Sequence, residues 1–242
     1  MVLRGVKKKR TPHAHGKGPQ ASLLSATKQV MDKQIEKRIE TNYPISSTAS
    51  ETAQDRSLIA CPIFRHELEA VLEELGLAPR INYMHYSIHN NPMRMEEELQ
   101  SSLEQVRTTG EDVRFLVGRH CKGKRDMTEV VEDCGGKIPQ ARNCIDILVG
   151  DELAKKLQKN RTSLMTPAWI RMINQSIKEG HWSVTDARLN LGWYNKILIL
   201  DTGVEALSDE QIIDFYDLTQ VEVEILPVDL SHFKMLVQEL LQ

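Results

Sequence analysis

The chain has 242 residues, of which 40% are hydrophobic, 27% charged and 5% aromatic, and its formal net charge is −3. This composition predicts an ordinary soluble protein, long enough for one large domain or two small ones. It argues against nucleic-acid binding, because few aromatic rings can stack on single strands and the net charge does not attract polyanions. No apolar run has the length of a membrane span, so we expect no membrane partner.

The first 56 residues are expected to stand apart from the folded domain. Residues 1–20 are basic, rich in Gly and Pro and without apolar periodicity, which predicts disorder. Residues 21–40 have helical character, and residues 41–55 form a polar linker. We therefore expect a disordered and partly helical basic extension over residues 1–56, followed by an α/β domain over residues 57–242. One alternative function follows from the tail alone: an adaptor recruited through its basic residues.

From residue 57 onward, strand and helix patterns alternate. Short apolar runs predict strands or extended segments at 57–64, 80–88, 112–118, 137–140, 196–201 and 221–228. Amphipathic stretches predict helices at 65–76, 93–108, 126–136, 143–158, 166–180, 208–220 and 232–241. This order predicts a mainly parallel sheet covered by helices, with the strands at 57–64, 80–88, 112–118 and 196–201 in one sheet. Because residues 57–107 and 196–241 share one plan, a pseudo-symmetric two-lobed domain is the alternative.

The third strand is followed by a lookalike of a phosphate-binding loop. Gly118, Gly123 and Lys124 have the spacing of that motif, but Arg125 stands where the motif needs Ser or Thr for magnesium. We therefore expect no hydrolysis of ATP or GTP. Cations and exposed backbone amides near a helix start attract phosphate or carboxylate. A non-catalytic module that binds a small anion through Lys122, Lys124 and Arg125 is thus a second alternative, in which Lys124→Ala weakens only anion binding.

Four thiol or imidazole groups are predicted to gather at one edge of the sheet. Cys61 lies late in the first strand, His89 follows the second, Cys121 follows the third, and Cys144 opens a helix after an extended segment. The carboxyl ends of parallel strands meet at one edge, where ligand crevices form. This donor set suits tetrahedral zinc or an iron–sulfur cluster. A buried cysteine also serves as a small hydrophobe, and no C-x-x-C pair is present, so packing stays open as the alternative. Cys134, at the far end of a helix, is expected only to pack.

The absence of an export signal bears on the same cysteines. The first residues, "MVLRGVKKKR", lack the apolar core that a signal peptide needs. We therefore expect a cytoplasmic protein, whose cysteines are thiols or metal ligands rather than disulfides.

The chain resembles a family of uncharacterised microbial proteins in an ordered set of segments: "LIACPIFRHELEAVL", "HYSIHNNP", "FLVGRHCKGK", "IPQARNCIDILVG" and "TPAWI". The family is a domain of unknown function, and its genes often accompany corrinoid-dependent methyltransferases. The resemblance covers roughly residues 57–230. It places Cys61, His89, Cys121, Cys144 and Trp169 on the family pattern.

Three departures from that pattern affect the expected site. The glycine-rich loop of the family is the basic "GRHCKGK" here, the His-Asp before the last cysteine is Arg142-Asn143, and Ala168 replaces a glycine before Trp169. Arg142 could instead supply charge for an anionic ligand. The resemblance implies a fold and a site but no established reaction. The leading hypothesis is a Cys/His metal site that serves corrinoid-dependent methyl transfer as an accessory or a methyl acceptor. A partner, either a corrinoid protein or a methyltransferase, would hold the corrinoid.

Overall fold

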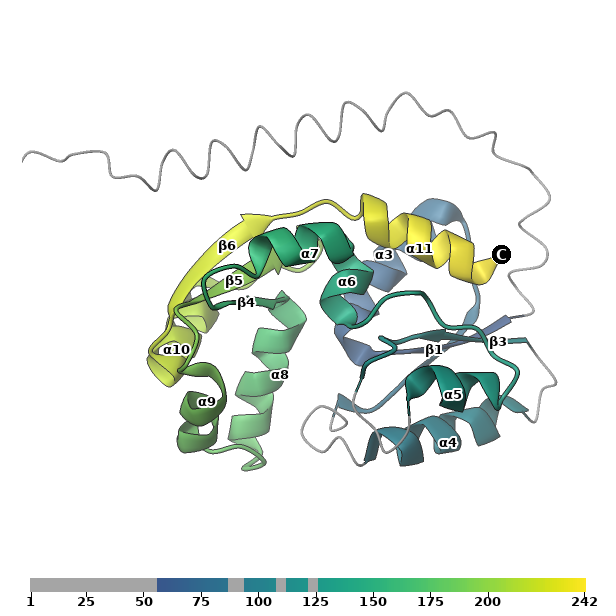
Figure 1. The fold of residues 1–242 in the computed structure, drawn as a ribbon, viewed down its shortest axis with the longest axis horizontal. Helices are drawn as coiled ribbons and strands as arrows, with labels where there is room; N and C mark the ends of the chain where they lie inside the picture. Colours follow the sequence, from purple (N-terminus) through teal and green to yellow (C-terminus); the bar gives the residue numbers. More distant parts are fainter. Residues whose placement is uncertain (1–55, 87–93, 108–111, 122–125) are drawn as a thin grey trace, which may run out of the picture. The chain divides into compact units, whose positions relative to one another are not determined.

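The computed structural model describes residues 56–86, 94–107, 112–121 and 126–242 (Figure 1). The predicted basic extension lies outside these ranges except for its last residue. The strands are β1 Arg56–Ala60, β2 Arg80–Tyr83, β3 Asp112–Leu116, β4 Thr162–Met165, β5 Lys196–Asp201 and β6 Glu222–Pro227. The helices are η1 Pro62–Phe64, α3 Arg65–Leu75, α4 Arg94–Arg107, α5 Met127–Glu132, α6 Cys144–Val149, α7 Asp151–Leu157, α8 Pro167–Lys178, α9 Val184–Leu191, α10 Asp209–Thr219 and α11 Ser231–Leu241.

The described strands form two parallel sheets of three strands each, in the orders β2-β1-β3 and β4-β5-β6. The predicted α/β class is therefore confirmed. The expectation that residues 196–201 join the first three strands is wrong, because β5 pairs with β4 and β6 instead. The repeated plan is present: β1 and β5 are each central, each pairs with the next strand after a helix, and each has a third strand on its other side.

The strand β5 is apolar along its length because both of its faces are buried. Leu198 and Leu200 face a large core that also contains Leu58 and Phe115 of the first sheet, so both sheets contribute to one buried cluster. The intervening residue, Ile199, faces a second cluster with side chains of α8, α9 and α10. A strand buried on both faces reads as a continuous hydrophobic run, as "KILIL" does.

Helices cover both sides of each sheet. In Figure 1, α4 and α5 lie on one side of the first sheet, and α3 and α11 lie on the other. The second sheet has α8 and α9 on one side and α7 on the other. None of the helices in the described parts of the chain combines the length and apolar character that a membrane-spanning segment needs.

Three elements, η1, β4 and α9, escaped the sequence prediction, and one predicted helix is divided. The helix expected over residues 143–158 breaks at Gly150, whose φ of 84° lies in the left-handed region, and becomes α6 and α7. The helix α9 begins at a capping box in which Ser183 and Asp186 satisfy each other's backbone amides. The strand β4 has only four residues, too few to show a period.

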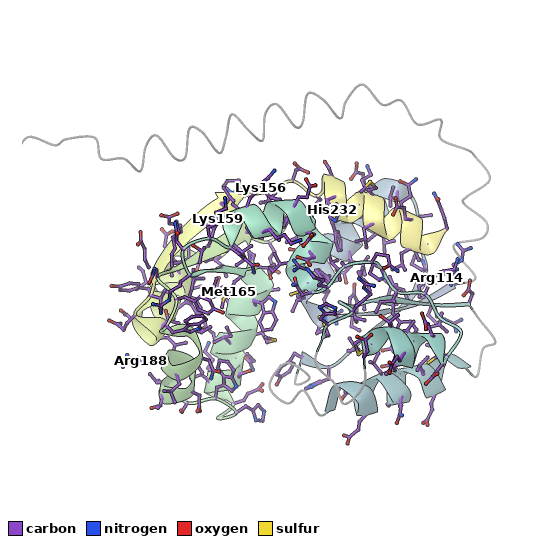
Figure 2. All side chains as sticks on the ribbon, viewed as in Figure 1. Arg114, Lys156, Lys159, Met165, Arg188 and His232 are labelled. Carbon is purple, nitrogen blue, oxygen red and sulfur yellow. The ribbon has the colours of Figure 1, made fainter. Side chains whose placement is uncertain are left out.

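A buried arginine fixes the C-terminal helix to the first sheet. Arg114 is 2% exposed, and its Nε donates to the carbonyl of Leu240 at 2.9 Å while its guanidinium pairs with Asp112 (Figure 2). Arg56 donates to the carbonyl of Gln242 at 2.8 Å. The last carbonyls of a helix have no partner within the helix, so these cations satisfy them and favour the negative end of its dipole.

Candidate functional site: three thiols beside the first sheet

Three cysteines stand at the ends of secondary-structure elements. Cys61 directly follows β1 and precedes η1, and its amide donates to the carbonyl of Leu116 at the end of β3. Cys121 closes a turn after β3, with its amide 3.0 Å from the carbonyl of Gly118. Cys144 is the first residue of α6. Two of the thiols therefore follow the carboxyl ends of neighbouring strands. The predicted strand over residues 57–64 is too long, because it ends at Ala60 and residues 62–64 form η1.

Gly118 allows the turn that carries Cys121 to lie against the start of α6. The amides of Arg119 and His120 donate to the carbonyls of Ala141 and Arg142, at 2.9 and 2.8 Å. A Cβ atom on Gly118 would lie 2.5 Å from the Cα of Asn143. Only a residue without a side chain permits this approach of two backbones.

The pKa values of the three thiols depend on burial and, for Cys61 and Cys144, on the charge of the other thiols. Burial raises the pKa of Cys144 to about 12, the pKa of Cys61 well above its usual value, and the pKa of Cys121 above its usual value. Thiolate charges on Cys144 and Cys121 would raise the pKa of Cys61 further, and a charge on Cys121 would raise that of Cys144. Without a cation, all three groups are neutral thiols near pH 7.

Hydrogen bonds oppose the effect of burial and lower the pKa of each thiol. The indole Nε1 of Trp169, in the first turn of α8, donates to the Sγ of Cys144 at 3.3 Å. Against the effect of burial, this bond lowers the pKa of Cys144, and the backbone amide of Ile63 lowers that of Cys61. The backbone of Gly118 has the same effect on Cys121. Donors to sulfur are what tune the thiolate ligands of metal centres, whereas a purely hydrophobic cysteine does not need them.

Several predicted site residues are not placed. His89, Lys122, Lys124 and Arg125 lie outside the described residues, so neither the fourth metal ligand nor the basic loop is seen. Within the part of the chain that the structure describes, no three His, Cys, Asp or Glu side chains stand in a geometry ready to hold a metal ion. Cys134 belongs elsewhere: its Sγ donates to the carbonyl of Val130 at 2.9 Å, and it packs against the main core, as expected.

Arg142, proposed from the sequence as an anion ligand, is engaged with acidic side chains. Its Nε donates to the Oδ2 of Asp146 at 2.7 Å, and its guanidinium also pairs with Asp151. Asp146 is 2% exposed, so Arg142 supplies the charge that keeps this buried carboxylate paired. Arg142 therefore has a structural partner, whatever else it binds.

A second polar cluster was missed by the sequence analysis. Glu67 in the first turn of α3 is 4% exposed, and its Oε1 accepts a hydrogen bond from Thr202, after β5, at 3.1 Å. Its Oε2 has no partner among the described residues. Nearby, the carboxylate of Glu205 contacts His66 at 2.7 Å and Arg171 at 2.6 Å. The sequence could have indicated that Glu67 is buried, because Glu67 lies four residues before the core residue Val71 and therefore on the same face of the helix.

Gly118→Ala is expected to lower the free energy of unfolding by about 3 kcal/mol, because the new methyl group meets backbone atoms that cannot rotate away. The turn must then move from α6, so we also expect Cys121 to react with a thiol reagent at least about tenfold faster. Gly180→Ala is the control. Gly180 has a φ of 75° with open space around it. Its replacement by alanine should lower the free energy of unfolding by about 1 kcal/mol without changing thiol reactivity. Equal reactivity in both variants would contradict the close approach.

Glu67→Gln is expected to stabilise the protein at neutral pH by on the order of 1 kcal/mol. Burial raises the pKa of Glu67, so the folded state holds its proton more tightly than the unfolded state does. The protein therefore loses stability as the pH rises from the unfolded pKa of about 4.3 through the folded pKa, and the glutamine variant does not. Chemical denaturation from pH 3.5 to 8 tests this; a difference that stayed constant over that range would contradict it.

The fold and these contacts define an α/β protein in which three free thiols lie within electrostatic range beside the first sheet. Residues 83–237 match the family described as "Protein of unknown function (DUF1638)". This match covers more than half of the chain, so the protein belongs to that family.

Other comparisons add little. No curated protein matches the chain. Among solved structures, it is similar to glutamate racemase from Aquifex pyrophilus, with 14% identity and a TM-score of 0.33 over 76% of this chain and 82% of that one. Such a low score does not define a shared fold, and the α/β class rests on the strands and helices described above.

Proposed function

We propose that this cytoplasmic protein binds a thiophilic metal, either zinc or an iron–sulfur cluster, through Cys61, Cys121 and Cys144. His89, which follows the second strand in the sequence, is the proposed fourth ligand. The observation that supports the proposal is that Cys61, Cys121 and Cys144 are free thiols whose charges affect one another's pKa values, and that the sulfur of Cys144 accepts a hydrogen bond from Trp169. Thiolates with such donors are the ligands that both kinds of centre use.

The neutral state of the thiols is compatible with this proposal. A metal ion displaces the protons of its thiol ligands. The positive charge of the ion offsets the repulsion between the resulting thiolates, so that they can close around it. The described residues do not form a ready cage, so binding requires the sulfurs to approach one another as their protons leave. The turn after β3 is the segment whose movement would bring Cys121 toward the other two.

Elemental analysis of protein purified without oxygen tests whether the protein binds a metal and identifies that metal. We expect about one zinc per chain, or iron together with sulfide and the visible absorption of a cluster. Protein that arrives empty should take up zinc, or iron and sulfide, on reconstitution. If neither preparation held metal above the level of the buffer, the proposal would be wrong and the anion-binding module would become the better hypothesis.

We further propose, from the family resemblance, a role in corrinoid-dependent methyl transfer as an accessory or a methyl acceptor. Zinc keeps a coordinated thiol deprotonated near neutral pH, which a methyl acceptor requires. In the incubation of the metal-loaded protein with methylcobalamin, a thiolate would take the methyl group as the cobalt–carbon bond breaks and cob(I)alamin leaves. Mass spectrometry should then find the methyl group on Cys61, Cys121 or Cys144. Methylation of Cys134 to the same extent would indicate non-specific chemistry. The absence of any methylation would leave only the accessory role.

A further inference from the structure

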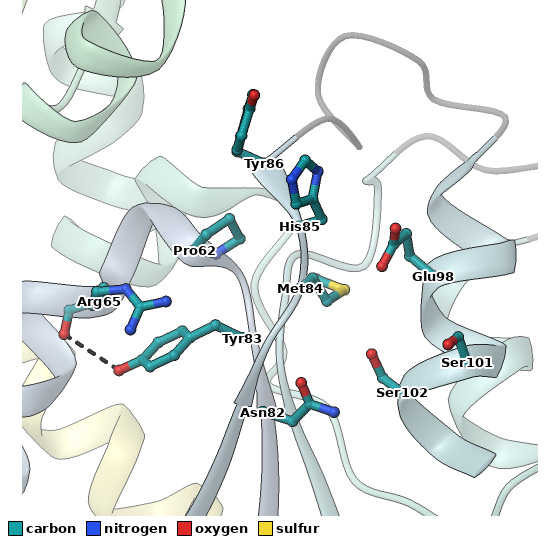
Figure 3. Close-up of a pocket in the computed structure, with 10 residues that line it drawn as sticks. All are labelled: Pro62, Arg65, Asn82, Tyr83, Met84, His85, Tyr86, Glu98, Ser101 and Ser102. Carbon is teal, nitrogen blue, oxygen red and sulfur yellow. Dashed lines mark hydrogen bonds between the residues drawn. The ribbon is translucent and has the colours of Figure 1, made fainter. Parts of the chain in front are cut away.

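A cavity of about 460 Å³ opens at the carboxyl end of β2 (Figure 3). It lies between that strand end, the start of α3 and the middle of α4. Its volume falls in the range of about 300–1,000 Å³ that small-molecule sites occupy. The carboxyl edge of a parallel sheet is also where ligands bind in α/β proteins. Size and position therefore both favour a binding site.

The α4 wall of the cavity contains a polar residue where a hydrophobic one would be more stable. Leu99, Leu103 and Val106 are at most 5% exposed and face the core, and Ser102 is equally buried among them at 5%. Ser102 lines the cavity together with Glu98, four residues earlier. A buried serine on an otherwise apolar helix face breaks the pattern that stabilises the fold, and such exceptions gather at functional positions.

The polar groups on this wall can all accept hydrogen bonds, and one of them, the carboxylate of Glu98, only accepts. Figure 3 shows Asn82 and Met84 pointing from the end of β2 toward α4, where Glu98, Ser101 and Ser102 lie. Among the described residues on this side, Glu98 carries the one formal charge. A protonated amine has three N–H donors and no acceptor, which matches a carboxylate and two hydroxyl oxygens.

The cation on the opposite side is already engaged. The guanidinium of Arg65 lies 3.9 Å from the centre of the Tyr83 ring and 3.9 Å from a carboxylate oxygen of Glu69. Figure 3 shows Arg65 and Tyr83 together, on the other side of the strand from Glu98. Met84, which is 3% exposed, gives the cavity an apolar surface between the two. An alkyl chain can pack on the methionine while its ammonium group meets Glu98.

We propose that this cavity binds a small organic molecule with a protonated primary amine, held by Glu98, Ser101 and Ser102. Three probes of equal chain length test the head group: n-butylammonium, 1-butanol and butyrate. By saturation-transfer NMR and titration, n-butylammonium should bind with a Kd of about 1 mM or weaker, as expected for a ligand of so few atoms. The other two probes should bind at least about tenfold more weakly.

Matched variants of α4 separate the site from non-specific charge effects. Glu98→Gln should weaken n-butylammonium binding by about ten- to a hundredfold, because it removes a charge-assisted hydrogen bond. Ser102→Leu should abolish binding by filling the cavity, with the fold retained because the position already faces the core. Glu97→Gln removes the neighbouring exposed carboxylate and should change the Kd less than about twofold. Butyrate binding as well as the amine, or equal effects at Glu97 and Glu98, would overturn the proposal. No metal enters this test, so its result is independent of the thiol site.

Discussion

Cys121→Ser is expected to reduce metal affinity by more than about 100-fold. Changes to residues that merely support metal ligands cost about 10–100-fold, and removal of a ligand should cost more. The fold should survive, because the residue is only partly buried and the main core contains side chains of both sheets independently of any metal. Metal content after dialysis against a chelator, measured beside thermal unfolding without metal, separates the two effects.

Cys134→Ser is the matched control for that experiment. Cys134 is likewise partly buried and packs against the main core, but its sulfur bonds the carbonyl of Val130 at the end of α5. The Cys134→Ser protein should keep its full metal content. Cys144→Ser should lose metal as Cys121→Ser does, and Trp169→Phe should retain metal with a lower affinity, because only the donor to the Cys144 sulfur is removed. Full metal content in Cys121→Ser, or loss in Cys134→Ser, would contradict the proposed site.

Metal affinity is expected to rise by up to about a thousandfold per pH unit between pH 6 and 8. Burial raises the pKa of Cys144 to about 12 and those of Cys61 and Cys121 above their usual values, so all three bind protons throughout this range. Each thiol must release its proton to bind the metal as a thiolate. Every released proton contributes a factor of about ten per pH unit, and the sign is fixed: higher pH favours the metal.

Two measurements check this dependence. Competition with a chelator of known pH behaviour gives the slope, and titration in weak buffer counts the protons released, about three per metal. Cys121→Ser should lower both values by about one. A flat profile would show that the sulfurs are already thiolates in the free protein, contrary to the effect of burial, or that they are not the ligands.

The strands and helices were largely readable from the sequence because each obeys a local rule. The apolar run of β5, the amphipathic pattern of α3 with Gly76 at its end, and the Pro167 start of α8 are set by neighbours within a few residues. The same holds for the position of Cys121 after β3, whereas the first strand was predicted to continue past Cys61 to residue 64 and ends at Ala60. Local rules do not say which strands pair, so the sequence left a single sheet and a two-lobed domain open as alternatives.

The close contacts of the candidate site depended on tertiary structure. Glu67 and Thr202 are 135 residues apart, and Trp169 lies 25 residues after Cys144, so no periodicity links either pair. The role of Gly118 is likewise invisible in the sequence, where it reads as the first glycine of a phosphate loop; the structure shows it packed against the backbone of Asn143.

By itself, the sequence determined the α/β class, most of the elements and the position of Cys121 after a strand, because hydrophobic periodicity and turn residues act over short distances. Only the tertiary structure decided that the strands form two sheets sharing one core rather than one sheet, that Trp169 donates to the sulfur of Cys144, and that Ser102 and Glu98 border a cavity. These features follow from which buried surfaces fit together across the whole chain, and that choice is a property of packing, not of any local segment.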